Sequence, residues 1–189
     1  MKKVLLLSLS LSLLLFGGAA FATEGGISFD LSPTYATEPT GPFGGGWGID
    51  LGANADFARL GINVNLPQNM RLQGRASVGY YEWTKDYIFG DSLEYTRYPF
   101  DVGGRFVYSI NPQFKAHGDL AIEISRDKFE ASVSPGVKAS SSEWNIGAVP
   151  GVGITYYVND QFYVGADARY HAITDDYFTL GATFGFNIP

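Results

Sequence analysis

From about residue 26 to the C-terminus, the chain alternates apolar side chains with polar or small ones in long runs. One such run, Phe114 to Ser125, places Phe, Ala, Gly, Leu and Ile on one side and every ionisable residue on the other. A period of two is typical of a β-strand with two different faces. The same division recurs over residues 70–83, 94–110, 144–156, 164–171 and 178–188. We therefore predict a protein built from long strands.

Three short polar turns separate these runs, at 66–69, 110–113 and 158–161. Their spacing of roughly 45 residues leaves room for two strands and one longer loop between successive turns. Two more strands, 26–36 and 47–66, are then needed to reach eight. Within the second of them the apolar residues change from odd to even positions, which predicts a one-residue bulge near Ala58. The alternative is a turn at 54–59, which would alter the strand count.

Longer loops are predicted at 37–46, 85–92, 126–141 and 174–176. Pro150 falls inside an apolar row, where its missing amide hydrogen would interrupt a ladder of hydrogen bonds. We expect a local bulge or bend at that position.

The polar sides of these runs, hereafter the polar rows, indicate which face meets lipid. They contain many Gly, Ser and Thr and few Lys or Glu, which suits a crowded barrel interior better than a soluble exterior. Aromatic residues collect towards the ends of the runs, as in the interface girdles of membrane barrels. The predicted fold class is all-β: an eight-stranded antiparallel up-and-down transmembrane β-barrel. A secreted soluble barrel or sandwich is the alternative.

The first 22 residues have the three parts of a secretory signal peptide: Lys2 and Lys3, an apolar run at 4–16, and Ala20-Phe21-Ala22. We expect cleavage near Thr23, a single barrel domain over residues 23–189, and location in the outer membrane. The chain has no cysteine, so we expect no disulfide and no lipid attached through cysteine. Its net charge of −6 argues against a nucleic-acid partner.

The C-terminal run contains Thr179-x-Gly181-x-x-Phe184-x-Phe186. With this ending and the repeated strands, the sequence resembles the small eight-stranded outer-membrane barrels of the OmpA-like and OmpX-like group over nearly all of the mature chain. The resemblance implies that these four residues form an insertion signal for the barrel-insertion machinery, with periplasmic chaperones assisting. It also implies outer-membrane lipid and lipopolysaccharide as surroundings, and it identifies no partner for the loops.

An eight-stranded barrel is narrow enough to be filled by its own side chains, and unpaired charges inside it are costly. We therefore predict that the ionisable residues of the polar rows pair across strands and plug the lumen, leaving a structural or surface-interaction role. A narrow porin-like channel for ions or small solutes is the alternative. The predicted lumen residues are Arg71, Arg75, Arg97, Asp101, Arg105, Lys115, Asp119, Glu123, Asp167, Arg169 and His171.

One group of residues suggests an enzyme. His171 precedes Asp175 and Asp176, and small-barrel enzymes that modify lipid A use a histidine with a nearby serine, but here residues 172–174 are Ala, Ile and Thr. We therefore expect no catalytic activity, and a lipid A-modifying enzyme is the least favoured hypothesis. No spacing of residues indicates a metal or a cofactor, and we expect neither.

Overall fold

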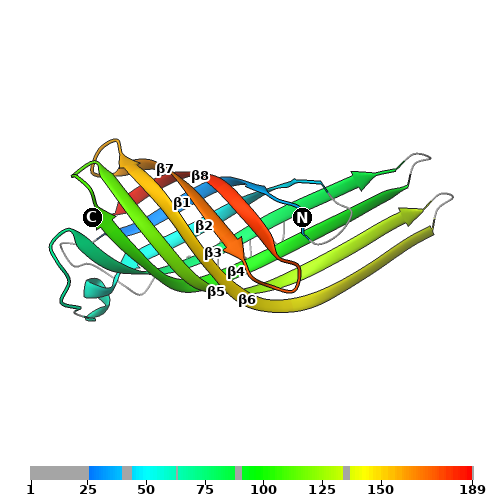
Figure 1. Cartoon of the computed structure of the whole chain (residues 1–189), viewed down its shortest axis with the longest axis horizontal. Coiled ribbons are helices and arrows are strands. Elements are labelled where there is room, and N and C mark those ends of the chain that lie inside the picture. The colour runs from blue at the N-terminus through cyan, green and yellow to red at the C-terminus, as the bar shows by residue number, and fades with distance from the viewer. Residues whose placement is uncertain (1–25, 40–43, 63, 88–90, 134–136, 189) are drawn as a thin grey trace.

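The computed structural model describes residues 26–39, 44–62, 64–87, 91–133 and 137–188, which form a closed ring of eight strands (Figure 1). Each strand pairs antiparallel with its neighbours in the chain, and the first closes against the last. The predicted up-and-down barrel is therefore confirmed. The strands are β1 (Ile27–Ala36), β2 (Gly46–Asp56), β3 (Met70–Asp86), β4 (Ser92–Ser109), β5 (Phe114–Val133), β6 (Val137–Tyr157), β7 (Phe162–His171) and β8 (Tyr177–Ile188).

The predicted signal peptide, residues 1–22, and the cleavage position at Thr23 lie outside the described residues. Among the residues that are described, no helix is both long enough and apolar enough to cross a bilayer.

The two faces of each strand differ as the alternation predicts. On β5 the carboxylates of Asp119 and Glu123 are buried inside the ring, whereas Leu120 and Ile122 point outward and are 64% and 55% exposed. The exposed apolar residues of the other strands continue this outer belt. The barrel thus has a polar interior and an apolar outer wall, the arrangement that a bilayer requires.

Two of the three predicted turns share one local mechanism. The Oδ1 atom of Asn111 accepts hydrogen bonds from the backbone amides of Gln113 and Phe114, at 2.9 and 2.8 Å. The Oδ1 atom of Asn159 accepts in the same way from the backbone amides of Gln161 and Phe162, at 2.9 and 2.8 Å. Asparagine favours such turns because its side chain replaces a backbone acceptor. These turns, the first residues of β1 and the last residues of β8 lie at one end of the barrel, hereafter the turn end.

The strand predicted at 47–66 is wrong in its second half. β2 ends at Asp56, a 3-10 helix, η1 (Phe57–Leu60), follows, and Gly61 ends that helix with a positive φ of 74°. The shift in alternation therefore marks the end of the strand and not a bulge near Ala58. This outcome places a turn close to the alternative of 54–59, yet the strand count remains eight because 61–69 connects directly to β3.

The loop predicted at 126–141 is also wrong. β5 and β6 continue in unbroken register from Phe114↔Tyr156 to Val133↔Val137, so most of this range is a strand hairpin. Together β3, β4, β5 and β6 project beyond the four shorter strands at the opposite end of the barrel, hereafter the loop end (Figure 1). On β5 the outward residues Arg126 and Lys128 are polar there, whereas Phe129 packs against buried side chains, so the outward apolar row on which the prediction depended does not continue.

Proline affects two ladders without producing a bulge. Pro150 stays in register with Leu120 on β5, and the pairing of β6 with β7 has a gap at this residue. The bulge expected at Pro150 is therefore absent. On the seam between β1 and β8, paired residues are interrupted at Ser32 and Pro33.

Candidate functional site

Two arginines inside the barrel face an aspartate directly opposite them on the next strand. Arg97 on β4 donates to Asp127 on β5 through Nε and Nη2, at 2.8 and 2.7 Å. Arg105 donates to Asp119 in the same way, at 2.7 and 2.8 Å. Two parallel N–H···O bonds per pair hold each guanidinium in a fixed plane. Both pairs are buried and join β4 firmly to β5.

The other two buried arginines connect strands on the opposite side of the ring. Arg75 on β3 contacts Asp30 on β1 at 3.1 Å. Arg169 on β7 contacts Asp167 at 3.0 Å and Asp50 on β2 at 3.8 Å. The contacts from β3 to β1 and from β7 to β2 skip intervening strands, so they cross the lumen.

Several acids of this network are not among the predicted lumen residues. Asp30 and Asp50 belong to alternating polar rows of β1 and β2, a signal that was present, whereas Asp127 fell in the range taken for a loop. With these additions, buried carboxylates outnumber buried guanidiniums among the described residues. Asp101, for example, accepts a hydrogen bond from Ser77 at 3.2 Å and forms no ion pair with an arginine in the described part of the chain.

His171 is fully buried within the barrel. Its Nδ1 atom lies 2.5 Å from the carboxylate of Glu123 and its Nε2 atom 3.1 Å from the Thr179 hydroxyl. The ring of Tyr177 stacks on the imidazole, with centroids 4.0 Å apart and planes 13° apart. Both ring nitrogens and one face of the imidazole are thus in contact with other side chains.

The two acids that follow His171 in sequence do not contact it. The carboxylate of Asp176 accepts hydrogen bonds from the Ile173 amide at 3.0 Å and from the Tyr170 hydroxyl at 2.6 Å. The backbone oxygen of Asp175 accepts one from Arg97 at 3.3 Å. Partial burial in this connection raises the pKa of the Asp175 carboxyl, against the opposing effect of the Arg97 charge. Both acids therefore shape the β7–β8 connection.

An aromatic cluster occupies the lumen next to His171, towards the loop end. Tyr81, Trp83 and Tyr177 are buried, with ring centroids 5.5 to 6.0 Å apart. Arg97 lies beside them, its guanidinium 4.8 Å from the Tyr177 ring and 5.5 Å from the Tyr95 ring. Such cation–π contacts stabilise a guanidinium that is shielded from water.

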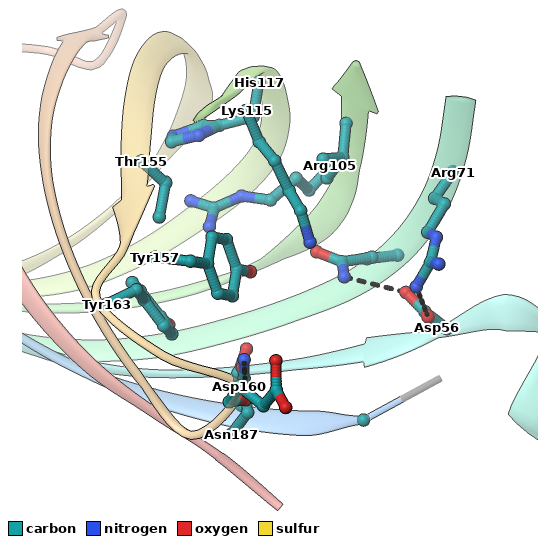
Figure 2. A pocket seen from close by; sticks show the side chains of 14 residues that line it. Asp56, Arg71, Arg105, Lys115, His117, Thr155, Tyr157, Asp160, Tyr163 and Asn187 are labelled. Carbon is teal, nitrogen blue, oxygen red and sulfur yellow. Dashed lines mark hydrogen bonds and ion pairs between the residues drawn. The ribbon is translucent and has the colours of Figure 1, made fainter. Parts of the chain in front are cut away.

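A cavity of about 240 Å³ opens at the turn end of the lumen (Figure 2). Lys115 reaches across it, and its ammonium lies 3.9 Å from the Tyr157 ring centroid. Arg71 is at the rim, with its side chain 54% exposed and a single contact of 3.5 Å to Asp56. The Nε2 atom of His117 is buried and, within the described residues, has no hydrogen-bond partner. Lys115 and Arg71 therefore differ from the deeper arginines, which are tightly paired.

The residues of the proposed insertion signal lie on both faces of β8. Thr179 points inward and contacts His171, and Gly181 lies on the same inner row. Phe184 and Phe186 point outward and are 54% and 37% exposed. Their role as a signal remains a prediction. Among the described residues, no cluster of three or more His, Cys, Asp or Glu is arranged to hold a metal ion.

The sequence matches the family model described as "Outer membrane protein beta-barrel domain" over residues 8–188. A search among curated protein sequences found no match.

Solved structures with the same architecture include proteins of different activities. Ail, the attachment invasion locus protein of Yersinia pestis, solved in complex with the heparin analogue sucrose octasulfate, is 17% identical with a TM-score of 0.57, covering 88% of this chain and 100% of that one. OprG of Pseudomonas aeruginosa is 10% identical with a TM-score of 0.56, covering 86% and 96%. The outer membrane enzyme PagL is 16% identical with a TM-score of 0.52, covering 84% and 99%. At such low sequence identities, these similarities show a shared fold and nothing more.

Proposed function

Because the chain belongs to the family of outer membrane protein β-barrel domains, we propose that it is an outer-membrane barrel with a structural and surface-interaction role, and that its lumen is closed to solutes. The turn end faces the periplasm and the loop end faces the outside, as the short turns and the long projecting strands suggest.

The projecting strands carry the proposal of surface interaction. β6 pairs with β5 over its whole length, but with β7 only from Gly151 to Tyr157, plus one bridge between Ala148 and Ala172. Among the described strands, none pairs with the remaining edge of β6, from Val137 to Gly147. An exposed strand edge presents a row of backbone donors and acceptors to any extended chain that approaches.

The bridge between Ala148 and Ala172 shows which residues of β6 direct their backbone groups to the open edge. Ala148 donates its amide to Ala172 and accepts from it, at 3.2 and 2.9 Å, so its backbone groups face β7. Alternate residues of a strand face the same neighbour, and Ser140, Ser142 and Trp144 therefore direct their amides to the open edge. Pro150 has the same parity, so its missing amide does not interrupt the ladder with β5.

The partner that fits this edge is an extended polypeptide segment, which would add a strand through main-chain hydrogen bonds. Ail, the attachment invasion locus protein, has a similar fold, which is consistent with a surface role for this chain. The exposed Trp144, 71% accessible, adds an apolar contact beside the open edge.

The test uses cells that carry the protein in their outer membrane and a surface coated with reduced, alkylated serum albumin, which offers extended chains. Wild-type cells should be retained, and Ser142→Pro should reduce retention several-fold because it removes one edge donor. Ser142→Ala, which keeps that donor, should behave as wild type. Equal retention of cells with Ser142→Pro, at equal surface abundance of folded barrel, would disprove the role of the edge.

The closed lumen is supported by the ion pairs that cross it and by the aromatic cluster of Tyr81, Trp83 and Tyr177. In planar bilayers the refolded protein should show no steady single-channel current. Replacing Trp83 and Tyr177 together by alanine should produce measurable current by removing the cluster. Steady unitary steps from the wild type would instead establish the porin-like alternative.

The absence of enzymatic activity is part of the same proposal, although PagL shares the fold. His171 is buried and contacts Glu123, Thr179 and Tyr177, so lipid acyl chains on the outer wall do not reach it. Mass spectra of lipid A should be identical in cells with and without the protein. An altered acyl pattern that disappears with His171→Ala would overturn this conclusion.

A further inference from the structure

The connection between β2 and β3 is the feature of the turn end that the ion pairs and turns do not explain. After η1 its described residues, 61–62 and 64–69, lie beside the ring of strands (Figure 1). Ile62 and Val64 are 50% and 48% exposed on this connection. Each of the two asparagine-based turns has one exposed aliphatic residue, Ile110 at 59% and Val158 at 58%, whereas the connection between β2 and β3 brings Ile62 and Val64 together with further apolar side chains. A group of exposed apolar side chains is unfavourable in water and favours an apolar neighbour.

These side chains form one wall of a groove of about 650 Å³, within the range of about 300 to 1,000 Å³ that is common for small-molecule sites. The other wall is the first part of β3, where Met70 and Leu72 contribute. The groove also includes Phe57, Ile62, Val64 and Leu66.

The groove is continuous with the lipid-facing belt. Met70 and Leu72 pair with Tyr108 and Phe106 of β4, and both of these aromatic residues point outward and are 40% and 39% exposed. The apolar surface therefore passes without interruption from the outer wall into the groove. Its natural occupant is an acyl chain of the leaflet that surrounds the turn end.

A cation lies at one end of the groove. Arg71 borders both this groove and the lumen cavity of Figure 2. Its single 3.5 Å contact with Asp56 and its exposure of 54% leave N–H groups available, unlike the two-bond pairs deeper in the barrel. An exposed guanidinium beside an apolar groove is complementary to a phosphate with an attached acyl chain.

We propose that this groove binds one phospholipid of the periplasmic leaflet, with an acyl chain between the side chains of Ile62, Val64 and Leu66 and β3, and with its phosphate on Arg71. The inference depends on the orientation proposed above and assigns the connection between β2 and β3 a role as a membrane-interface element.

The first test measures where the connection lies. The chain has no cysteine, so a single nitroxide label can be placed by Val64→Cys, with Val102→Cys on the outer belt and Gln161→Cys in a polar turn as references. In reconstituted vesicles, the label at 64 should resemble that at 102, accessible to oxygen and shielded from a water-soluble nickel chelate. A label at 64 as accessible to nickel as the label at 161 would overturn the proposal.

The second test identifies the lipid. Native mass spectrometry of the protein extracted in mild detergent should show one retained phospholipid. Retention should fall several-fold in Arg71→Gln and in Ile62→Asn, but not in Arg126→Gln, the same change on an exposed arginine at the loop end. Equal retention in Arg71→Gln and wild type would disprove the phosphate contact, and a retained lipid A mass would disprove the assignment to a periplasmic phospholipid. Neither readout depends on the open edge of β6.

Discussion

The ring of Tyr81 on β3 packs against Gly48, its direct partner on β2, so closely that a Cβ atom at residue 48 would overlap the Cδ1 atom of the tyrosine. Tyr81 also donates a hydrogen bond of 2.6 Å to Asp50 and takes part in the aromatic cluster. Gly48 therefore sets the position of Tyr81, whose side chain contributes both to the polar network, through Asp50, and to the aromatic cluster.

Gly48→Ala should displace Tyr81 and lower the free energy of unfolding by about 1 to 3 kcal/mol, as overpacking typically does. Urea titration in lipid vesicles, followed by the shift in gel mobility on heating, measures this change. Gly104→Ala is the matched control, because the nearest atom to its added Cβ is 3.9 Å away. Equal loss of stability in both variants would contradict the role of the close approach.

Arg97→Gln should lower stability by about 3 to 5 kcal/mol, because it leaves the Asp127 carboxylate buried without its cation. Asp127→Asn should have a similar effect, and the double variant should lose less than the sum of the two. Lys128→Gln, which removes an exposed ion pair with Glu130, should leave the same urea titration unchanged. Additive losses in the double variant would show that the two residues act separately.

Export should remove the first 22 residues. Intact-mass measurement of protein from the outer membrane should place the new N-terminus near Thr23. Ala22→Arg should prevent cleavage, because the small residue at the cleavage site is replaced by a bulky cation. A mature protein that retains residues 1–22 would show that this prediction is wrong.

Phe186→Ser should slow insertion by weakening the C-terminal signal, measured as the rate at which heat-modifiable barrel accumulates with purified insertion machinery. Leu180→Ser provides the comparison, because Leu180 faces lipid on the same strand and lies outside the signal residues, at 51% exposure. If both variants slow insertion equally, the effect reflects lost apolar surface and not recognition.

Prediction of strands from the sequence succeeded wherever one face of the strand meets lipid and the other face meets the lumen, as for Phe114 to Ser125. It failed beyond the lipid-facing belt. From Arg126 onward the pairing of β5 with β6 continues, but the outward residues Arg126 and Lys128 are polar, so the outward apolar row that marks the rest of the strand ends. The same change hid Asp127, which proved to be a partner of Arg97.

The end of β2 failed for another reason. The change of parity near Ala58 is compatible with either a bulge or the end of the strand, and the difference lies in the positive φ of Gly61, which closes η1. Sequence shows a glycine there but not its conformation. The partners of the lumen arginines were equally hidden, because contacts such as Arg75 with Asp30 depend on how the ring closes.

The interruption at Ser32 and Pro33 bears on how the cylinder can come apart. β1 and β8 share far fewer rungs than β5 and β6, and this shortened seam joins the two strands most distant in sequence. Pulling on the chain ends would load that junction directly, so the first mechanical failure should be a lateral parting of the wall along it, while the long hairpins stay intact.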